Sequence, residues 1–228
     1  MDDREGISPS WIFPDPETAG EDGLLAMGGD LETTTLLHAY AQGIFPWYSE
    51  ETPILWWCPD PRMVLYPDRL KISKSLQQSI RNKGYRVVFD HDFRAVIRRC
   101  ARLPRKDQNG TWITPEMEEA YIKLHREGFA HSAETYLQKQ LVGGLYGVSL
   151  GGIFFGESMF REERDASKVA LVHMVQKIAA WDFDLIDVQQ STGHMRSLGA
   201  QEISRKEFLG ILSKSLHKIT KRGNWGRM

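Results

Sequence analysis

Hydrophobic positions in the second half of the chain recur at strand spacing. The segments 131–138, 140–151 and 152–162 alternate polar and apolar residues over short runs, with Gly151–Gly152 and the stretch around Lys139 between them. Alternating runs that are bounded by glycine-containing or polar turns are typical of β-hairpins. The pattern therefore predicts three antiparallel strands joined by tight turns.

The remainder of this half reads as helix, strand and helix. Residues 167–181 are apolar on nearly every side, which is typical of a buried helix. Residues 184–190 predict a buried strand, and residues 205–220 predict a final amphipathic helix. Three strands, a buried helix, a strand and a further helix form the order of an acyltransferase-like α/β domain. Fold order alone does not give function.

The first sixty residues differ in composition from the rest and are rich in glycine, proline and aromatic residues. Residues 33–42 predict a helix, and Gly43 stands where a left-handed C-cap is favoured. Four prolines between Pro46 and Pro61 then exclude a regular helix. We therefore expect an α+β protein with a small N-terminal domain over 1–60 and an acyltransferase-like C-terminal domain over 61–228.

The segment between these parts predicts three helices and a strand. A basic helix is expected over 73–82, and a short strand, YRVVF, follows it. Asp92 can cap a second helix, whose apolar face lies opposite a stripe of arginines. Thr114 and Pro115 start a third helix, which Gly128 ends. The arginine stripe consists of Arg94, Arg98 and Arg102.

The composition is that of an ordinary globular protein, with 41% hydrophobic and 26% charged residues. The acidic, polar beginning has neither the basic nor the apolar region of a secretory leader, and no run approaches the roughly 18 apolar residues of a membrane span. The two cysteines, Cys58 and Cys100, are too few for a disulfide framework and fit a reducing compartment. These features predict a cytoplasmic protein.

The net charge of −1 conceals a strong asymmetry along the chain. Residues 1–60 carry twelve acidic residues and one basic residue, whereas residues 69–106 carry twelve basic residues and two acidic ones. The tail from Ser204 carries seven basic residues against Glu207. The near-neutral pI is therefore compatible with a polyanionic partner on one basic surface.

The number and spacing of histidine and cysteine residues suggest neither a metal site nor a cysteine nucleophile. The seven histidines form no close pair and no HExxH motif, and no CxxC motif is present, so we expect no metal. Cys100 lies on an apolar helix face, where a core role is favoured. Nothing in the WWCPDP context of Cys58 lowers its pKa.

Acetyl-CoA, the donor that the fold order suggests, is disfavoured by the loop that would bind it. Phosphates bind at a helix start when glycine lets the backbone amides approach. The loop over 160–168 has no glycine and carries Glu162, Glu163 and Asp165, which would repel a pyrophosphate. We therefore expect that CoA is not the donor.

Polar residues interrupt two otherwise apolar strands. Alternation places Glu157 and Met159 on one strand face, and Asp187 and Gln189 on one face of the other strand. A satisfied internal hydrogen-bond pair explains such residues about as well as a polar floor beneath a pocket. Large aromatic residues in loop-like contexts each suit core packing, but together they suggest a pocket wall: Tyr40, Phe45, Trp47, Trp56, Trp57 and Trp112.

Ten segments stand in a recognisable order: GLLAMGGDL (23–31), GIFPWYS (43–49), PILWWCPDPR (53–62), GTWIT (110–114), GFAHSAE (128–134), LVGGLYGV (141–148), FGESMF (155–160), ASK (166–168), LIDVQ (185–189) and SLGA (197–200). Together they resemble the leucyl/phenylalanyl-tRNA–protein transferase family, from about Phe13 to Leu212. The resemblance implies a small N-terminal domain followed by an acetyltransferase-like (GNAT-like) α/β domain with a mostly antiparallel sheet. It also implies transfer of Leu or Phe, and less well Met, from aminoacyl-tRNA onto proteins that begin with Arg or Lys. The product is a degradation signal of the N-end rule pathway.

The family match assigns the polar strand residues to the acceptor amine. The donor ester is already activated, so the reaction needs no ATP, metal or CoA. The acceptor α-amine has a free pKa of about 7.7–8.0 and must lose a proton before it attacks. The match implies that the Gln189 carbonyl receives the ammonium, while Asp187 orients or polarises that amide. Glutamine is a very poor base, so a purely orienting role stays open. Glu157 is a candidate to bind the cationic acceptor or the amino group of the donor.

The resemblance also implies an apolar pocket that prefers a donor side chain with an unbranched Cβ followed by bulk. Discrimination at this scale is worth about 1–3 kcal/mol, so some transfer of Met is expected. Trp47 or Trp112 can stack the terminal adenine of the tRNA. The residues that match the pocket are Tyr40, Phe45, Trp47, Trp112, Leu145, Phe154, Met159, Leu171, Met174, Ile178 and Ile186.

For the tRNA body, the family offers the basic helix at 73–82. Here Gln77 and Gln78 occupy its middle, which makes it less basic than the family pattern. The arginine stripe is expected to compensate, and a solvated helix face explains that stripe equally well. The basic residues assigned to RNA are Lys74, Arg81, Lys83, Arg94, Arg98 and Arg102.

Two rival classes remain at this point. A CoA-dependent N-acetyltransferase conflicts with the acidic loop at 160–168. A non-catalytic RNA-binding adaptor suits the basic patch, but it leaves an apolar pocket floored by Asp187 and Gln189 without a purpose. A transfer assay with leucyl-tRNA and an Arg-initiated peptide separates the three classes.

Overall fold

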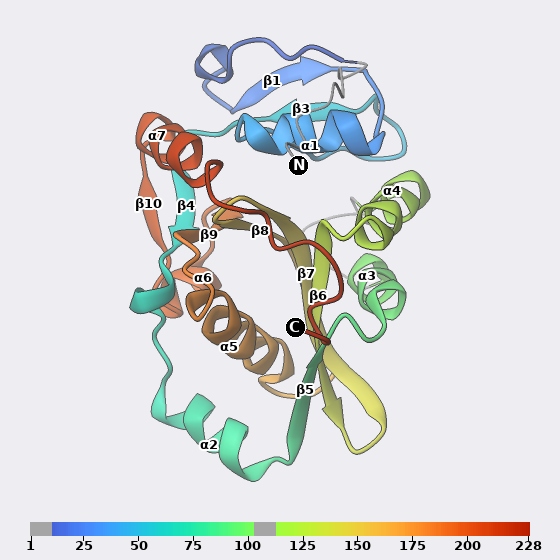
Figure 1. Ribbon diagram of the computed structural model, residues 1–228, viewed down its shortest axis with the longest axis vertical. Helices are drawn as coiled ribbons and strands as arrows, with labels where there is room; N and C mark the ends of the chain where they lie inside the picture. The colour runs from blue at the N-terminus through green and yellow to red at the C-terminus, as the bar shows by residue number, and fades with distance from the viewer. Residues whose placement is uncertain (1–10, 103–112) are drawn as a thin grey trace.

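A small antiparallel sheet forms the beginning of the computed structural model, which describes residues 11–102 and 113–228 (Figure 1). Its strands lie in the order β1–β3–β2. Gly43 follows α1 with a φ of +74°, as the C-cap prediction requires. The elements are a 3-10 turn η1 (Pro16–Thr18), β1 (Leu24–Met27), α1 (Thr33–Ala41), β2 (Phe45–Pro46) and β3 (Leu55–Trp57).

A larger sheet of seven strands in the order β10–β4–β9–β8–β7–β6–β5 forms the rest of the molecule. Among the described strands, β8 and β9 pair in parallel, and every other neighbouring pair is antiparallel. The predicted hairpins and the mostly antiparallel sheet are therefore confirmed. The strands are β4 (Arg62–Leu65), β5 (Tyr85–Phe89), β6 (Ala130–Leu137), β7 (Gln140–Leu150), β8 (Ile153–Arg161), β9 (Leu185–Gln189) and β10 (Gln201–Ile203).

Helices cover both faces of the larger sheet (Figure 1). The helices α3 (Phe93–Arg102) and α4 (Pro115–Arg126) lie on one face, and α5 (Ala166–Ala179) lies on the other. The remaining elements are η2 (Pro67–Arg69), α2 (Lys74–Asn82), α6 (Gly193–Ser197) and α7 (Arg205–Ser215). The last helix thus ends at Ser215, five residues before the predicted end at Thr220.

The predicted helix starts are confirmed by their hydrogen bonds. Asp92 Oδ1 accepts from the backbone N–H of Ala95 at 3.0 Å at the start of α3. Thr114 Oγ1 accepts from the N–H of Met117 at 3.2 Å at the start of α4. The predicted apolar face of α3 is buried as expected: Phe93, Val96, Ile97 and Cys100.

The core forms two clusters, one on each face of the larger sheet. The first cluster joins the small sheet and α1 to residues of α3 and α4, such as Val96 and Tyr121. The second lies between the sheet and α5, and it includes Phe154, Met174 and Trp225. Within 11–102 and 113–228, no helix combines the length and the apolar character needed to cross a bilayer.

Candidate active site

A cavity of about 790 Å³ opens where β8 and β9 cease to pair. The parallel ladder runs from Ile153 opposite Leu185 to Phe155 opposite Asp187. Residues beyond that point on both strands line the cavity, together with the start of α5, part of α6 and residues 45–47 of the small sheet. The separation of two strands in one sheet thus creates a space that reaches into the core.

A β-bulge at Glu157 decides which side chains face which side of this space. Tyr146 of β7 pairs with Ser158 and Gly147 pairs with Gly156, so Glu157 is an extra residue in β8. A bulge reverses the alternation of faces after it. Glu157 contacts α1 and α4 on one face, whereas Met159 packs against the second cluster on the α5 side. The prediction that these two residues share a face is wrong for this reason.

Glu157 lies at the centre of a hydrogen-bond network. Tyr40 of α1 donates to its Oε1 at 2.8 Å, and Tyr121 of α4 donates to its Oε2 at 3.1 Å. Gln189 Nε2 donates to Oε1 at 2.9 Å. The two tyrosine hydroxyls also contact each other. The sequence analysis gave Tyr121 no role at the site, although a buried tyrosine hydroxyl needs a polar partner and so points to such a network.

The environment of Glu157 suits a group that exchanges a proton near neutral pH. Burial raises the pKa of Glu157 to about 7; the hydrogen bonds from Tyr40 and Tyr121 oppose this shift, and the charge of Asp187 adds to it. Burial and the Glu157 carboxylate raise the pKa values of Tyr40 and Tyr121, so both hydroxyls stay protonated and donate. A carboxyl group with such a pKa is a candidate acid or base.

Asp187 forms a buried ion pair with Arg62, a residue to which the sequence analysis gave no role. Arg62 Nε donates to Oδ1 at 2.8 Å and Nη2 donates to Oδ2 at 2.6 Å. The guanidinium also lies over the rings of Phe45 at 4.9 Å and Phe208 at 4.5 Å. Sequence alone offers no sign of this pairing, because 125 positions separate the two residues.

Asp187 acts on Gln189 through the backbone. Its Oδ1 accepts from the backbone N–H of Gln189 at 2.9 Å, whereas the side-chain amide of Gln189 donates to Glu157. The prediction that Asp187 orients that amide is therefore wrong: Glu157 orients it. Because an ionised carboxylate only accepts, the amide nitrogen is the atom that faces Glu157, and Gln189 is also one of the residues that line the cavity.

Gln189 occupies a backbone conformation that is uncommon for a side-chain-bearing residue. Its φ is +66°, and the N–H of Gln190 donates to the carbonyl of Val188 at 2.8 Å, which closes a γ-turn around Gln189. Conformations of this kind cost of order 1–3 kcal/mol and persist where the surroundings enforce them. The Asp187–Arg62 pair supplies that enforcement.

The predicted pocket residues divide into a lining set and a supporting set. Tyr40 is fully buried and holds Glu157, while Met174 and Ile178 lie buried in the second cluster. Trp56 is core, since its ring is fully buried and its Nε1 donates to Gly28 O at 2.8 Å. Trp112 lies outside the described residues. The residues that line the cavity are Phe45, Trp47, Leu145, Phe154, Met159, Leu171 and Ile186.

The basic residues assigned to RNA lie in two places. On α2, Lys74 and Arg81 are exposed, and Ser79 Oγ joins this helix to Asp165 Oδ2, on the cavity wall, at 2.7 Å. The stripe on α3 faces acidic residues of α4. Its Arg98 lies 2.7 Å from Glu118, and its Arg94 lies 3.9 Å from Glu119.

Within the described residues, no group of three or more His, Cys, Asp or Glu side chains is placed to hold a metal ion. Cys58 and Cys100 are both buried. Burial raises the pKa of Cys58, which disfavours its thiolate.

Two family models match the chain. The model for leucyl/phenylalanyl-tRNA protein transferase matches residues 64–213, and the model for the N-terminal domain of that protein matches residues 29–60. A leucyl/phenylalanyl-tRNA–protein transferase of Anaeromyxobacter sp. (strain Fw109-5) is 59% identical over 213 residues, covering 93% of this chain and 91% of the relative. One of Syntrophobacter fumaroxidans is 54% identical over 219 residues, covering 96% and 94%.

Similarity to solved structures is much looser. A GCN5-related N-acetyltransferase from Kribbella flavida shares 12% identity at a TM-score of 0.39, covering 72% of this chain and 58% of that one. L-PGS from Bacillus licheniformis shares 13% identity at a TM-score of 0.39, covering 71% and 52%.

Proposed function

We propose that the cavity between β8 and β9 is where this chain, which belongs to the leucyl/phenylalanyl-tRNA–protein transferase family, moves an aminoacyl group from tRNA to the N-terminus of a protein. One observation carries the proposal. The same cavity holds an apolar recess and, beside it, the Glu157 and Gln189 side chains. A transferase that joins an apolar donor side chain to a cationic acceptor needs an apolar recess and polar side chains next to each other.

The apolar recess is proposed to hold the donor side chain, Leu or Phe and less well Met. Leu145, Met159, Leu171 and Ile186 reach it from three strands and a helix, and Trp47 stands half-buried at another part of the cavity. Trp47 is packed against Trp57 at 5.7 Å, which fixes a ring on which the terminal adenine can stack.

The acceptor is proposed to enter as a protein that begins with Arg or Lys, so that the product becomes a degradation signal. Its α-ammonium would donate hydrogen bonds to the Gln189 carbonyl oxygen and to Glu157. The ammonium must lose a proton before it attacks, and Glu157, with its pKa raised by burial to about 7, is better matched to accept that proton than an amide is. Gln189 then orients the amine, and Asp187 with Arg62 holds Gln189.

The chemical step follows from these positions. The amine nitrogen attacks the ester carbonyl carbon, a peptide bond forms, and the bond from that carbon to the ribose oxygen breaks. The ammonium passes one proton to Glu157 before the attack. The attacking nitrogen loses a second proton as the peptide bond forms, and the departing ribose oxygen takes up that proton and leaves as a hydroxyl. Holding the two reactants together accounts for much of the acceleration in a reaction of an already activated ester.

We propose further that the cavity does not use CoA. Asp165 is buried at the start of α5, and it lines the part of the cavity where a pyrophosphate would need backbone amides. Its carboxylate lies 3.6 Å from Arg164 and 3.7 Å from Lys168, so these two cations are engaged by Asp165 and are not free to hold a phosphate group. This leaves the activated ester as the donor.

The experiment that tests the proposed function is transfer from leucyl-tRNA to a peptide that begins with Arg. The wild-type chain should form the leucyl-peptide, and a peptide that begins with an acidic residue should serve as the control. The Gln189→Ala variant should retain the fold and lose most of the single-turnover rate. Acetyl transfer from acetyl-CoA in place of leucyl transfer would identify an acetyltransferase, and RNA binding without transfer would identify an adaptor.

Met159 should limit which donor side chains fit. Replacing Met159 with alanine removes a wall of the recess, so the ratio of transfer rates for Leu over Ile should fall by roughly tenfold, since pocket discrimination is worth about 1–3 kcal/mol. The measurement compares single-turnover rates with leucyl and isoleucyl donors. An unchanged ratio would mean that Met159 is not a wall.

The tRNA body is proposed to rest mainly on α2, with the α3 stripe as a second contact. Reversing Lys74, Arg81 and Lys83 to Glu should weaken binding of leucyl-tRNA and flatten its salt dependence, because each neutralised phosphate releases counterions. Replacing the stripe residues Arg94, Arg98 and Arg102 with Glu should weaken binding of leucyl-tRNA less. The reason is that Glu118 and Glu119 already offset the charges of Arg98 and Arg94.

A minimal donor, an aminoacyl-adenosine, serves as the control for this prediction, because it has no tRNA body. Both triple variants should transfer from it nearly as well as the wild type. A larger effect from the stripe than from α2 would reverse the assignment. Equal losses with tRNA and with the minimal donor would place the damage in the fold or the cavity.

A further inference from the structure

The segment after α7 returns across the molecule and inserts Trp225 into the core behind the cavity. Figure 1 shows this segment crossing from α7 toward the end of β5. The Trp225 side chain is fully buried and belongs to the second cluster, together with Phe154 and Met174. A segment that lies along the surface thus contributes one of the largest side chains of the interior.

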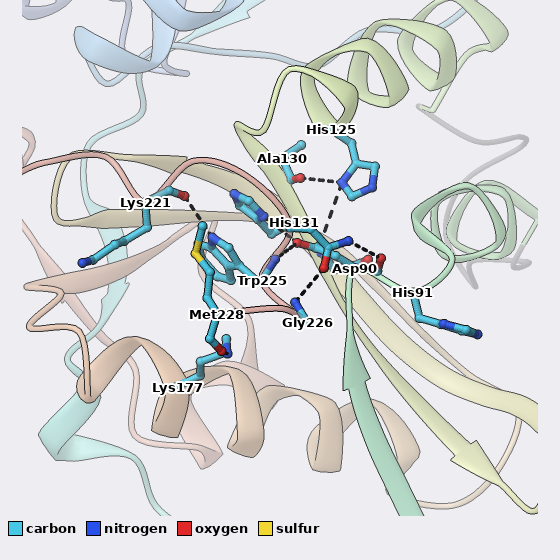
Figure 2. A network of polar contacts seen from close by, with 12 residues as sticks. Asp90, His91, His125, Ala130, His131, Lys177, Lys221, Trp225, Gly226 and Met228 are labelled. Carbon is cyan, nitrogen blue, oxygen red and sulfur yellow. Dashed lines mark hydrogen bonds and ion pairs between the residues drawn. The ribbon is translucent and has the colours of Figure 1, made fainter. Parts of the chain in front are cut away.

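The backbone, as well as packing, fixes the position of this tryptophan. Asp90 accepts from the backbone N–H of Trp225 at 2.7 Å and from that of Ser132 at 2.8 Å (Figure 2). Asn224 Nδ2 donates to the carbonyl of Asp90 at 3.0 Å. Asp90 therefore ties β6 and the final segment to the end of β5, and this fixes the backbone position from which the indole ring enters the core.

His131 completes the seat of the indole ring. Its ring stacks on Trp225 with centroids 3.8 Å apart and an angle of 10°, and its Nδ1 lies 2.9 Å from Asp90 Oδ2. Burial lowers the pKa of His131, so the neutral ring donates from Nδ1 to the carboxylate. The edge of Trp181 meets the indole from another side at 5.0 Å and 81°.

Phe154 connects this seat to the cavity. The Phe154 ring lines the cavity, and its centroid lies 5.9 Å from that of Trp225. On another side the ring lies against β7, where a Cβ added to Gly147 would come within 2.6 Å of Phe154 Cζ. The backbone of β7 leaves no room for the ring on that side, and the indole supports the ring from its own side.

We propose that Trp225 is a specificity-determining residue that sets the depth of the donor recess by holding Phe154 in place. It acts through Phe154 and touches no substrate. The inference rests on the proposed function, because it assumes that the recess takes the donor side chain. With a smaller residue at 225, Phe154 can retract toward the vacated space, and the recess becomes deeper without any change at its lining.

The test compares leucyl-adenosine with tryptophanyl-adenosine as donors to one Arg-initiated peptide, in single-turnover reactions. Trp225→Ala should raise the ratio of kcat/KM for the tryptophanyl donor over the leucyl donor by about tenfold or more. Trp225→Leu should give a smaller rise, and Trp225→Phe should stay near the wild-type ratio. This graded series keeps the test decisive where the alanine variant does not fold.

Trp181→Ala is the matched control, because it removes another ring from the same cluster of aromatics. It should reduce stability and leave the ratio unchanged. Equal losses with both donors across the 225 series, at an unchanged ratio, would overturn the proposal and leave Trp225 a structural residue. Absence of leucyl transfer by the wild-type chain would instead contradict the proposed function itself.

Discussion

Replacing Arg62 with methionine should lower the free energy of unfolding by about 3–5 kcal/mol, which is the usual cost of leaving one member of a buried ion pair alone. Asp187 is fully buried, and Arg62 supplies hydrogen bonds to both of its carboxylate oxygens. Methionine fills similar space between Phe45 and Phe208 and donates nothing. Urea unfolding followed by tryptophan fluorescence measures the loss.

The double variant Arg62→Met, Asp187→Asn is the control. It removes both charges, so it should recover a large part of the stability that the single variant loses. Transfer activity should not recover with it, because the Gln189 turn loses its charged support. A loss below about 1 kcal/mol in the single variant, the value of an exposed pair, would contradict the assigned role.

Replacing Glu157 with glutamine should lower the rate of transfer on the order of 10²-fold or more, the usual contribution of a positioned acid or base. The pH profile carries the sharper information. Burial raises the pKa of Glu157 to about 7, so in the wild type the rate should rise as pH increases through that value and the carboxylate forms. In the variant this rise of the rate near pH 7 should be absent. The remaining pH dependence should then reflect the pKa of the acceptor amine, which is about 7.7–8.0.

Tyr121→Phe provides the matched comparison for this profile. The Tyr121 hydroxyl donates to Glu157 Oε2, and a hydrogen bond to the charged form lowers a pKa. Removal of this hydrogen bond should therefore raise the pKa of Glu157 and move the rise of the rate to higher pH. A loss of burial would lower that pKa and move the rise to lower pH. An identical profile in wild type and Glu157→Gln would exclude Glu157 as the proton acceptor.

Periodicity along the chain predicted the elements that depend on nearby residues. The hairpins of β6–β8, the buried helix α5 and the capped helix at Phe93–Arg102 all follow from local alternation, turns and caps. The small strands β1–β3 were missed because they are short and pair only within a Gly/Pro-rich segment. Their stability comes from the aromatic residues that they bring together.

The chemistry of the site depended on features that alternation cannot reveal. The bulge at Glu157 adds one residue to β8 and reverses the face of Met159. The mark of it in FGESMF is Gly156, since an isolated glycine within a strand is often found at a bulge. Tyr40, Tyr121 and Arg62 reach Glu157 and Asp187 from other elements, over separations of 117, 36 and 125 positions. Residue types alone therefore pointed to Glu157, Asp187 and Gln189, while the partners of these side chains required the fold.

The contact between α2 and the start of α5 holds the basic helix at a set position relative to the cavity. Ser79 is bonded to Asp165, and the hydroxyl of Tyr85 donates to the carbonyl of Arg164 at 2.7 Å, so the basic helix keeps a fixed span from the cavity. With the tRNA body seated on α2 as proposed, this span gauges the length of the single-stranded 3′ end. When the 3′ end is one nucleotide too short, its ester stays outside the cavity. When the 3′ end is too long, it has to leave its extended conformation before the ester can enter the cavity.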